Sequence, residues 1–383
     1  MGTQILGIGI TGETLTDLER RIIRDTTPYA VVLFGRNIHS VSQVLSLVAD
    51  VKSLAATPPL FMIDEEGGRV DRLRTLIPGL PSAEAFAEGE QPVEMSEWFG
   101  RVIGMALRFF DIEVNLAPVV DVRGETPTQG LERRTFGKTP ESVVELAGAF
   151  MNGMHGAGVA SCIKHFPGIG LGSADPHYGA TVIDISAEEL IARDLVPFRE
   201  LGASAGSIMI GHGTYPQIDA PDLPASLSHR MTTGLLRTEA GFDGLAVSDD
   251  MEMHAVSDLG TYEETCDRAL MAGNDIILYC SHIERIPDLD AHINQRVGSN
   301  SPFARRFEEA IGRAQLFREH CDRLRTAAPP PAKSFDDVID EAIRFLEAFQ
   351  KTRPPYEIYV PEVDRRKGGR MPGKGHTGRE EWT

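Results

Sequence analysis

A glycine-rich segment near the middle of the chain carries the residues best suited to chemistry. The apolar run 159–163, which is typical of a buried parallel strand, leads into Lys164 and His165. Four of the next seven residues are glycine or proline, so we expect an exposed loop. In that loop Asp175 stands two residues before His177. A lone Asp-x-His is most often solvated surface. A carboxylate can also fix the tautomer of an imidazole and raise its basicity, so the spacing predicts a proton-transfer pair.

Eight short apolar runs alternate with helical patterns along the chain. They occupy residues 5–10, 30–34, 60–63, 114–122, 159–163, 207–210, 245–247 and 275–280. Because most of them are apolar throughout, we expect strands with both faces buried. An open doubly wound sheet is the alternative, but no G-x-G-x-x-G follows the first run. The pattern therefore predicts an α/β fold, a (β/α)8 TIM-type barrel.

Some of the helical patterns have recognisable ends. Thr14 is the expected N-cap of a helix over 14–25, and Ser186 with Glu189 forms a capping-box pattern that opens a helix to residue 201. Two further helical patterns, separated by three consecutive prolines, follow the last apolar run. We expect three parts: a catalytic domain over 1–325, a Pro-rich linker and C-terminal helix over 326–352, and a basic, disordered tail over 353–383.

Composition excludes several classes of protein. The net charge of −18 over 383 residues argues against nucleic acid or an anionic membrane as the main partner. No apolar run approaches the length of a membrane-spanning helix. The four cysteines are widely spaced and form no C-x-x-C pair, so neither a disulfide framework nor a zinc site is indicated. The first residues lack the pattern of a secretory signal, and we expect a cytoplasmic protein.

Polar residues gather where the predicted strands end, which is where barrels of this kind build their active sites. Two carboxylates with a histidine proton donor fit glycoside hydrolysis. A metal site competes for the same residue types, but the end of the first run reads GITGE, without the His-x-His common in metal-dependent barrel hydrolases. We therefore expect neither a metal nor a cofactor. The residues are Asp64, Arg69, Arg72, Asp121, Arg134, Lys164, His165, Asp175, His177, His212, Asp249 and Asp250.

Six segments resemble glycoside hydrolase family 3, most closely its bacterial β-N-acetylhexosaminidase branch. KHFPGIGLGSADPH, residues 164–177, is similar to the long signature of that branch. The others occur in the order expected for the family: IDEEGGRVDRLR at 63–74, NLAPVVDV at 115–122, RRTFG at 133–137, HGTYPQIDAPDLPASLS at 212–228 and GFDGLAVSDDMEM at 241–253.

This resemblance implies a retaining exo-β-N-acetylglucosaminidase. It assigns Asp249 as the nucleophile, His177 as the acid/base and Asp175 as the partner of His177. By the same resemblance, the substrate is a GlcNAc-containing muropeptide or disaccharide such as GlcNAc-1,6-anhydroMurNAc (peptide), cleaved in peptidoglycan recycling. Apart from the resemblance, we expect a monomer. The residues that match those holding the terminal GlcNAc are Asp64, Arg72, Arg134, Lys164 and His165.

The sequence departs from the family pattern at several places, among them Leu171-Gly172, which replaces a commoner polar pair. Ile169 stands where the signature often has His, and Pro176 stands where Ser or Thr is expected. Glu65 adds a negative charge next to Asp64, and this charge is expected to alter subsite preference. Two alternatives remain open: a phosphorylase that uses phosphate in place of water, and an inactive barrel that binds muropeptides.

Overall fold

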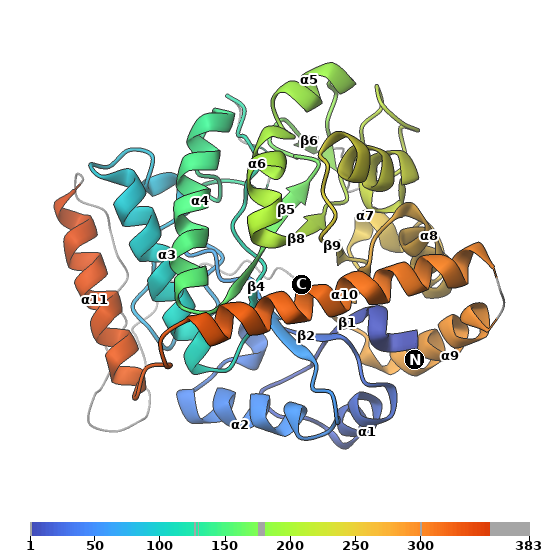
Figure 1. Cartoon of the computed structure of the whole chain (residues 1–383), viewed down its shortest axis with the longest axis horizontal. Helices are drawn as coiled ribbons and strands as arrows, with labels where there is room; N and C mark the ends of the chain where they lie inside the picture. The colour runs from blue at the N-terminus through green and yellow to red at the C-terminus, as the bar shows by residue number, and fades with distance from the viewer. Residues whose placement is uncertain (1, 126–127, 129, 175–180, 299–300, 353–383) are drawn as a thin grey trace.

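The computed structural model describes residues 2–125, 128, 130–174, 181–298 and 301–352 (Figure 1). Its eight main strands are parallel and form a closed barrel in the order β1-β10-β9-β8-β5-β4-β3-β2. The predicted (β/α)8 barrel is therefore confirmed. The strands are β1 (Leu6–Gly9), β2 (Ala30–Leu33), β3 (Leu60–Ile63), β4 (Val114–Asn115), β5 (Ala160–Phe166), β8 (Gly206–Ile210), β9 (Leu245–Asp250) and β10 (Ile276–Tyr279).

Helices surround the barrel, and the last of them packs on another helix. In order they are α1 (Asp17–Thr26), α2 (Val41–Lys52), α3 (Pro92–Phe109), α4 (Pro140–Gly156), α5 (Ala187–Ala192), α6 (Val196–Ala205), the π-helix η5 (Arg230–Glu239), α7 (His254–Ser257), α8 (Tyr262–Ala272), α9 (Ile286–Val297), α10 (Pro302–Ala327) and α11 (Phe335–Lys351). Of these, the short helix α7 and the helix α9 were not predicted from the sequence. The buried residues of α9, Ile286, Leu289 and Ile293, do have helical spacing.

Two helix predictions are wrong in detail. The first helix is capped by Thr16 rather than Thr14: the Thr16 hydroxyl accepts from the backbone N–H of Glu19, whose carboxylate accepts from Thr16 in return. The predicted helix over 186–201 is two helices, α5 and α6. Arg193 leaves helical geometry at the end of α5, and Pro197, in the first turn of α6, has no N–H with which to continue the earlier ladder.

The strands near the site differ from their predicted lengths, and this changes where their polar residues lie. β5 continues to Phe166, so Lys164 and His165 are part of the strand and are buried. β4 is only Val114–Asn115, although the chain beyond it stays beside β5, where the N–H of Val120 donates to the carbonyl of Lys164 at 2.7 Å. β9 extends to Asp250, so Asp249 is the second-last residue of this strand.

Helix α10 closes the N-terminal end of the barrel and crosses the front of the view in Figure 1. The Tyr29 hydroxyl, just before β2, donates to the carbonyl of Ala314 at 2.9 Å, and Arg318 donates to the carbonyl of Pro58, just before β3. Phe317 packs with the apolar residues of the barrel interior at this end. A ligand therefore enters from the opposite end, where the strands finish.

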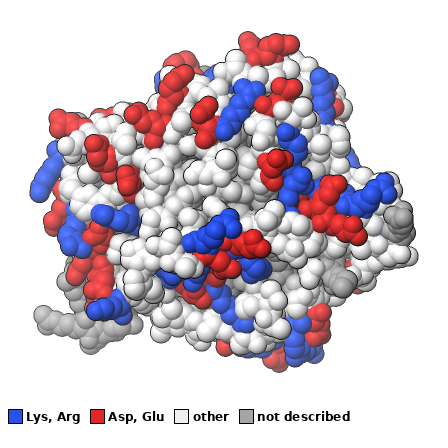
Figure 2. Space-filling view, viewed as in Figure 1, with Lys and Arg blue, Asp and Glu red and all other residues white. Residues whose placement is uncertain are grey.

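Helix α11 lies at the edge of the molecule against α3 (Figure 1). Phe345 stacks on Phe99 with ring centroids 5.8 Å apart, and the indole N–H of Trp98 donates to Glu341 at 2.8 Å. On the face seen in Figure 2, acidic and basic side chains are intermixed. Within the described ranges, none of the helices combines the length and the apolar composition needed to cross a membrane.

Candidate functional site

A cavity of about 330 Å³ opens at the C-terminal ends of the strands. Its volume lies in the usual range for small-molecule sites. Arg69, also considered from the sequence, is not among its lining residues and instead pairs with exposed Glu132 at 2.6 Å. Seven of the residues predicted from the sequence line this cavity: Asp64, Arg72, Arg134, Lys164, His165, His212 and Asp249.

Two predicted residues, Asp175 and His177, lie outside the described residues. The chain on either side of them is paired: β6 (Ser173–Ala174) and β7 (Thr181–Val182) form a small antiparallel sheet. Thr181 lines the cavity, so this sheet stands at its edge.

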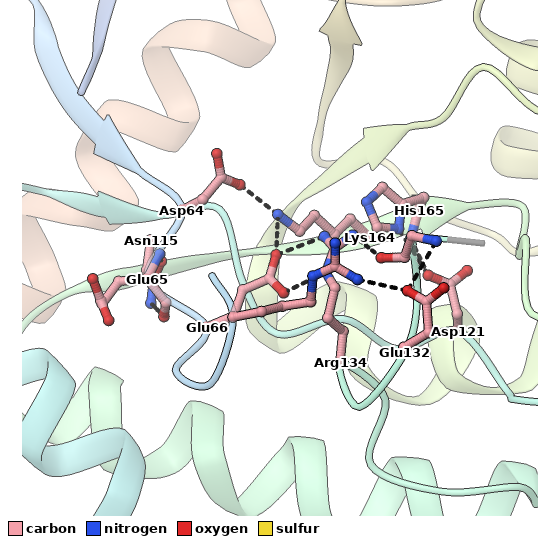
Figure 3. Close-up of polar contacts among 11 residues, drawn as sticks. Asp64, Glu65, Glu66, Asn115, Asp121, Glu132, Arg134, Lys164 and His165 are labelled. Carbon is pink, nitrogen blue, oxygen red and sulfur yellow. Dashed lines mark hydrogen bonds and ion pairs between the residues drawn. The ribbon is translucent and has the colours of Figure 1, made fainter. Parts of the chain in front are cut away.

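Four charged side chains on one wall of the cavity form a connected cluster (Figure 3). The Lys164 ammonium lies between Asp64 and Glu66, 2.7 Å from Oε1 of Glu66. Arg134 donates to both oxygens of Glu66, from Nε at 2.7 Å and from Nη2 at 2.8 Å. This bidentate arrangement is geometrically specific and strong. Glu66 was not predicted as a site residue, although it lies in the same segment as Asp64.

Glu66 and Lys164 are held in their charged forms. Burial alone would raise the pKa of Glu66, but Lys164 and Arg134 outweigh it and hold the pKa well below the ordinary 4.5. Burial also disfavours the Lys164 ammonium, yet Asp64 and Glu66 raise its pKa above 10.5. The wall therefore offers fixed N–H donors and carboxylate acceptors at neutral pH, the groups that recognise neighbouring hydroxyls.

A glycine turn after β3 brings these carboxylates into place. Gly67 and Gly68 have φ of 76° and 60°, and a Cβ on Gly67 would lie 2.4 Å from the carbonyl oxygen of Pro81. The turn directs the chain back so that Glu66 N–H donates to the Val70 carbonyl at 2.9 Å. Beyond it Arg72 reaches the cavity, and its Nε has no hydrogen-bond partner among the described residues.

Asp121, which follows the short strand β4, orients His165. One oxygen of Asp121 accepts from the backbone N–H of His165 at 3.2 Å and lies 2.8 Å from ring Nδ1, while the other accepts from Ile169 N–H at 2.7 Å. Because a carboxylate only accepts, we assign the proton to Nδ1, which directs Nε2 toward the cavity.

Replacing Asp121 with Asn is expected to lower kcat/KM by roughly 10- to 100-fold, because an amide can donate to Nδ1 and reverse the His165 tautomer. Steady-state kinetics on an aryl glycoside checks this expectation. NMR of the imidazole nitrogens should show the changed tautomer. Unchanged kinetics with an unchanged tautomer would contradict the assignment.

Asp249 faces the Lys164 cluster from β9. Its Oδ1 accepts from Asp250 N–H at 2.8 Å. His212 Nε2 donates to the carbonyl oxygen of Asp250, and these two atoms are 2.9 Å apart. Burial raises the pKa of Asp249, but His212, His165, that N–H and Lys164 together lower it below the ordinary 3.8. An ionised, partly buried carboxylate that lines a cavity can attack an electrophilic carbon or stabilise a developing cation.

The expectation that Glu65 adds charge beside Asp64 in the cavity is wrong. Glu65 is completely buried and points away from Lys164 in Figure 3. Its Oε2 accepts from the backbone N–H groups of Arg72 at 2.8 Å and of Leu73 at 3.0 Å. Glu65 therefore supports the loop that carries Arg72 and does not line the cavity.

No group of three His, Cys, Asp or Glu side chains within the described residues could hold a metal ion. Four of the charged residues of the cavity, Asp64, Glu66, Arg134 and Lys164, form ion pairs with one another.

Comparisons with known proteins agree with this architecture. The chain matches the glycosyl hydrolase family 3 N-terminal domain over residues 4–311. It is 37% identical to a β-hexosaminidase of Tolumonas auensis over 72% of this chain and 83% of that protein, and 36% identical to one of Pseudomonas aeruginosa over 73% and 82%. Among solved structures it resembles NagZ from Neisseria gonorrhoeae in complex with N-trifluoroacetyl-D-glucosamine, with a TM-score of 0.73 and 26% identity over 89% of this chain and 97% of that one. The chain belongs to glycosyl hydrolase family 3 and is a glycoside hydrolase similar to β-hexosaminidases.

Proposed function

We propose that this protein is a retaining exo-β-N-acetylglucosaminidase. The observation that carries the proposal is the position of Asp249, with a lowered pKa, in the same cavity as the charged cluster around Lys164. The N-trifluoroacetyl-D-glucosamine bound to the N. gonorrhoeae relative supports a GlcNAc-type ligand.

The terminal sugar is held by hydrogen bonds to its hydroxyl groups. In this proposal Asp64 accepts from two adjacent hydroxyls, and Lys164 and Arg72 donate to them. Arg134 and His165 are the other two residues that hold the sugar in this proposal. Glu66 balances the charge of Lys164 and Arg134, so the donors stay in position while the cavity is empty.

Catalysis proceeds by two displacements at the anomeric carbon. A carboxylate oxygen of Asp249 attacks this carbon, the glycosidic bond breaks, and His177 gives its proton to the leaving oxygen. His177, now neutral and oriented by Asp175, then takes a proton from water. The water oxygen attacks the same carbon and releases Asp249, so the sugar leaves with its original configuration.

We further propose GlcNAc-1,6-anhydroMurNAc (peptide) as the natural substrate, which places the enzyme in cytoplasmic peptidoglycan recycling, as a monomer. The curated β-hexosaminidase relatives support a hexosamine substrate. A neutral imidazole also repels an incoming muramic-acid carboxylate less than a second carboxylate would.

Turnover of 4-nitrophenyl β-glycosides tests this function. We expect hydrolysis of the GlcNAc glycoside with kcat/KM at least about 100-fold above that of the glucoside, because only the former carries the acetamido group. NMR of the first product formed should show the β-anomer, and an α-anomer would contradict retention. A roughly tenfold rate rise with phosphate, yielding sugar 1-phosphate, would favour a phosphorylase. Binding without turnover would favour a muropeptide-binding barrel.

A further inference from the structure

Two carboxyl groups that take no part in the cavity are buried together beneath the loop after β3. Glu65 and Asp71 are 0% and 1% exposed, and their side chains are hydrogen-bonded to each other. Neither lies within ion-pair distance of a Lys, Arg or His side chain of the described residues. The pair therefore places two acidic groups together in the protein interior with no ion-pair partner among the described residues, an arrangement that needs an explanation.

Each carboxyl group uses one oxygen to accept from the backbone. Oε2 of Glu65 accepts from Arg72 and Leu73, and Oδ2 of Asp71 accepts from Leu80 N–H at 3.1 Å. The remaining oxygens, Oε1 of Glu65 and Oδ1 of Asp71, have no other hydrogen-bond partner among the described residues. Two carboxylates cannot satisfy each other, since both only accept, but a carboxylic acid can donate to a carboxylate.

The electrostatics agree with one proton in this pair. Burial, and then the charge of Asp71, raise the pKa of Glu65 well above the ordinary 4.5. Burial also raises the pKa of Asp71, but the bond from Glu65 opposes this shift. The other charged group that acts on the pair is Arg74, which lies close to Asp71 and whose backbone N–H donates to it. Burial and the mutual hydrogen bond therefore favour one proton in the pair, so that one group is the carboxylic acid and the other the carboxylate.

We propose that Glu65 and Asp71 share a single proton and that this acid–carboxylate pair positions the sugar-binding loop. Glu65 lies between Asp64 and Glu66 in the chain, and Asp71 directly precedes Arg72. The pair thus joins the two ends of the loop from below, while those three neighbours line the cavity. Glu65 also accepts from Arg72 N–H, so it fixes the backbone that aims the guanidinium. Both residues are positioning residues and do not contact substrate.

The proton is tested by comparing the unfolding of the wild type with that of Glu65→Gln, a variant whose amide mimics the protonated acid at every pH. In the wild type the folded state keeps a proton that the unfolded chain releases above pH 4.5. A raised folded pKa contributes stability that is complete below the unfolded value and is lost as pH rises. The unfolding constant of the wild type relative to Glu65→Gln should therefore increase about tenfold per pH unit from about pH 5.5 to 7.5.

Glu132→Gln is the matched control, because Glu132 is exposed and paired only at the surface; its ratio to the wild type should stay constant over this range. A constant ratio for Glu65→Gln as well would mean that Glu65 is ionised in the folded protein, and would overturn the proposal. This measurement needs no enzymatic activity, so its result is independent of the proposed function.

The positioning role rests on the proposed function and is tested by kinetics on the 4-nitrophenyl GlcNAc glycoside. Glu65→Gln and Asp71→Asn each keep one donor and one acceptor in the pair, and KM should stay within about twofold of the wild type. Glu65→Leu removes the donor and the acceptor at position 65 and should raise KM about tenfold, with a smaller change in kcat. If Glu65→Leu does not fold, Glu65→Met, of similar length and without polar atoms, replaces it. An unchanged KM in the apolar variant would overturn the positioning role.

Discussion

Replacing Asp249 with Asn lowers kcat by about 10⁴-fold or more on the 4-nitrophenyl GlcNAc glycoside, since the amide cannot form the glycosyl–enzyme ester. The size of Asn is nearly the same, and its oxygen can still accept from Asp250 N–H as Asp249 does at 2.8 Å. The fold and the binding of sugar should therefore survive. Stopped assays over hours, with a thermal melt to confirm folding, measure this effect.

The neighbouring carboxylate supplies the control. The Asp250 side chain does not line the cavity, and its Oδ1 accepts from Glu252 N–H at 3.1 Å and Cys280 N–H at 3.3 Å, which an Asn oxygen can also do. Asp250→Asn is expected to stay within about tenfold of wild-type kcat/KM. Near-normal turnover by Asp249→Asn, or equal losses in the two variants, would contradict the assignment of Asp249 as nucleophile.

Replacing Glu66 with Gln is expected to cost about 3–5 kcal/mol in the free energy of unfolding, because it removes one partner of a buried ion cluster. Lys164 and Glu66 are 3% and 4% exposed as side chains, so water cannot compensate the uncovered charge. Lys164 and Arg134 would then face each other across a neutral amide. Activity should fall as well, since both cations are assigned to hold the sugar. Urea unfolding and steady-state kinetics measure the two effects.

The loss of unfolding free energy in Glu66→Gln should depend on pH. The pKa of Glu66 is lowered in the folded protein, so its stabilisation is complete above the ordinary value of 4.5 and is lost as pH falls through the folded value. The difference between wild type and Glu66→Gln should be constant from about pH 5.5 to 8 and shrink in acid. Glu132→Gln, at the exposed pair with Arg69, should cost under about 1 kcal/mol at any of these pH values. A comparable cost for the two variants would show that the buried cluster has no special role.

The sequence alone determined the barrel and most of the rim. Eight runs, most of them apolar throughout, indicate strands with two buried faces, and the closed barrel covered by helices provides these faces. The capping-box pattern at Ser186 is a local feature, and the Ser186 hydroxyl does accept from Glu189 N–H at 3.2 Å. The rim residues were identified because chemistry in such barrels gathers at the strand ends.

The tertiary structure alone decided what each of three consecutive acids, Asp64, Glu65 and Glu66, does. They have similar chemistry and adjacent positions, so composition cannot distinguish them. The left-handed turn at Gly67 and Gly68 and the closure of the barrel turn Glu66 toward Arg134, 68 residues away, and turn Glu65 into the protein beneath the loop. Which side chain faces the cavity depends on contacts between segments far apart in the chain, and these exist only once the barrel has closed.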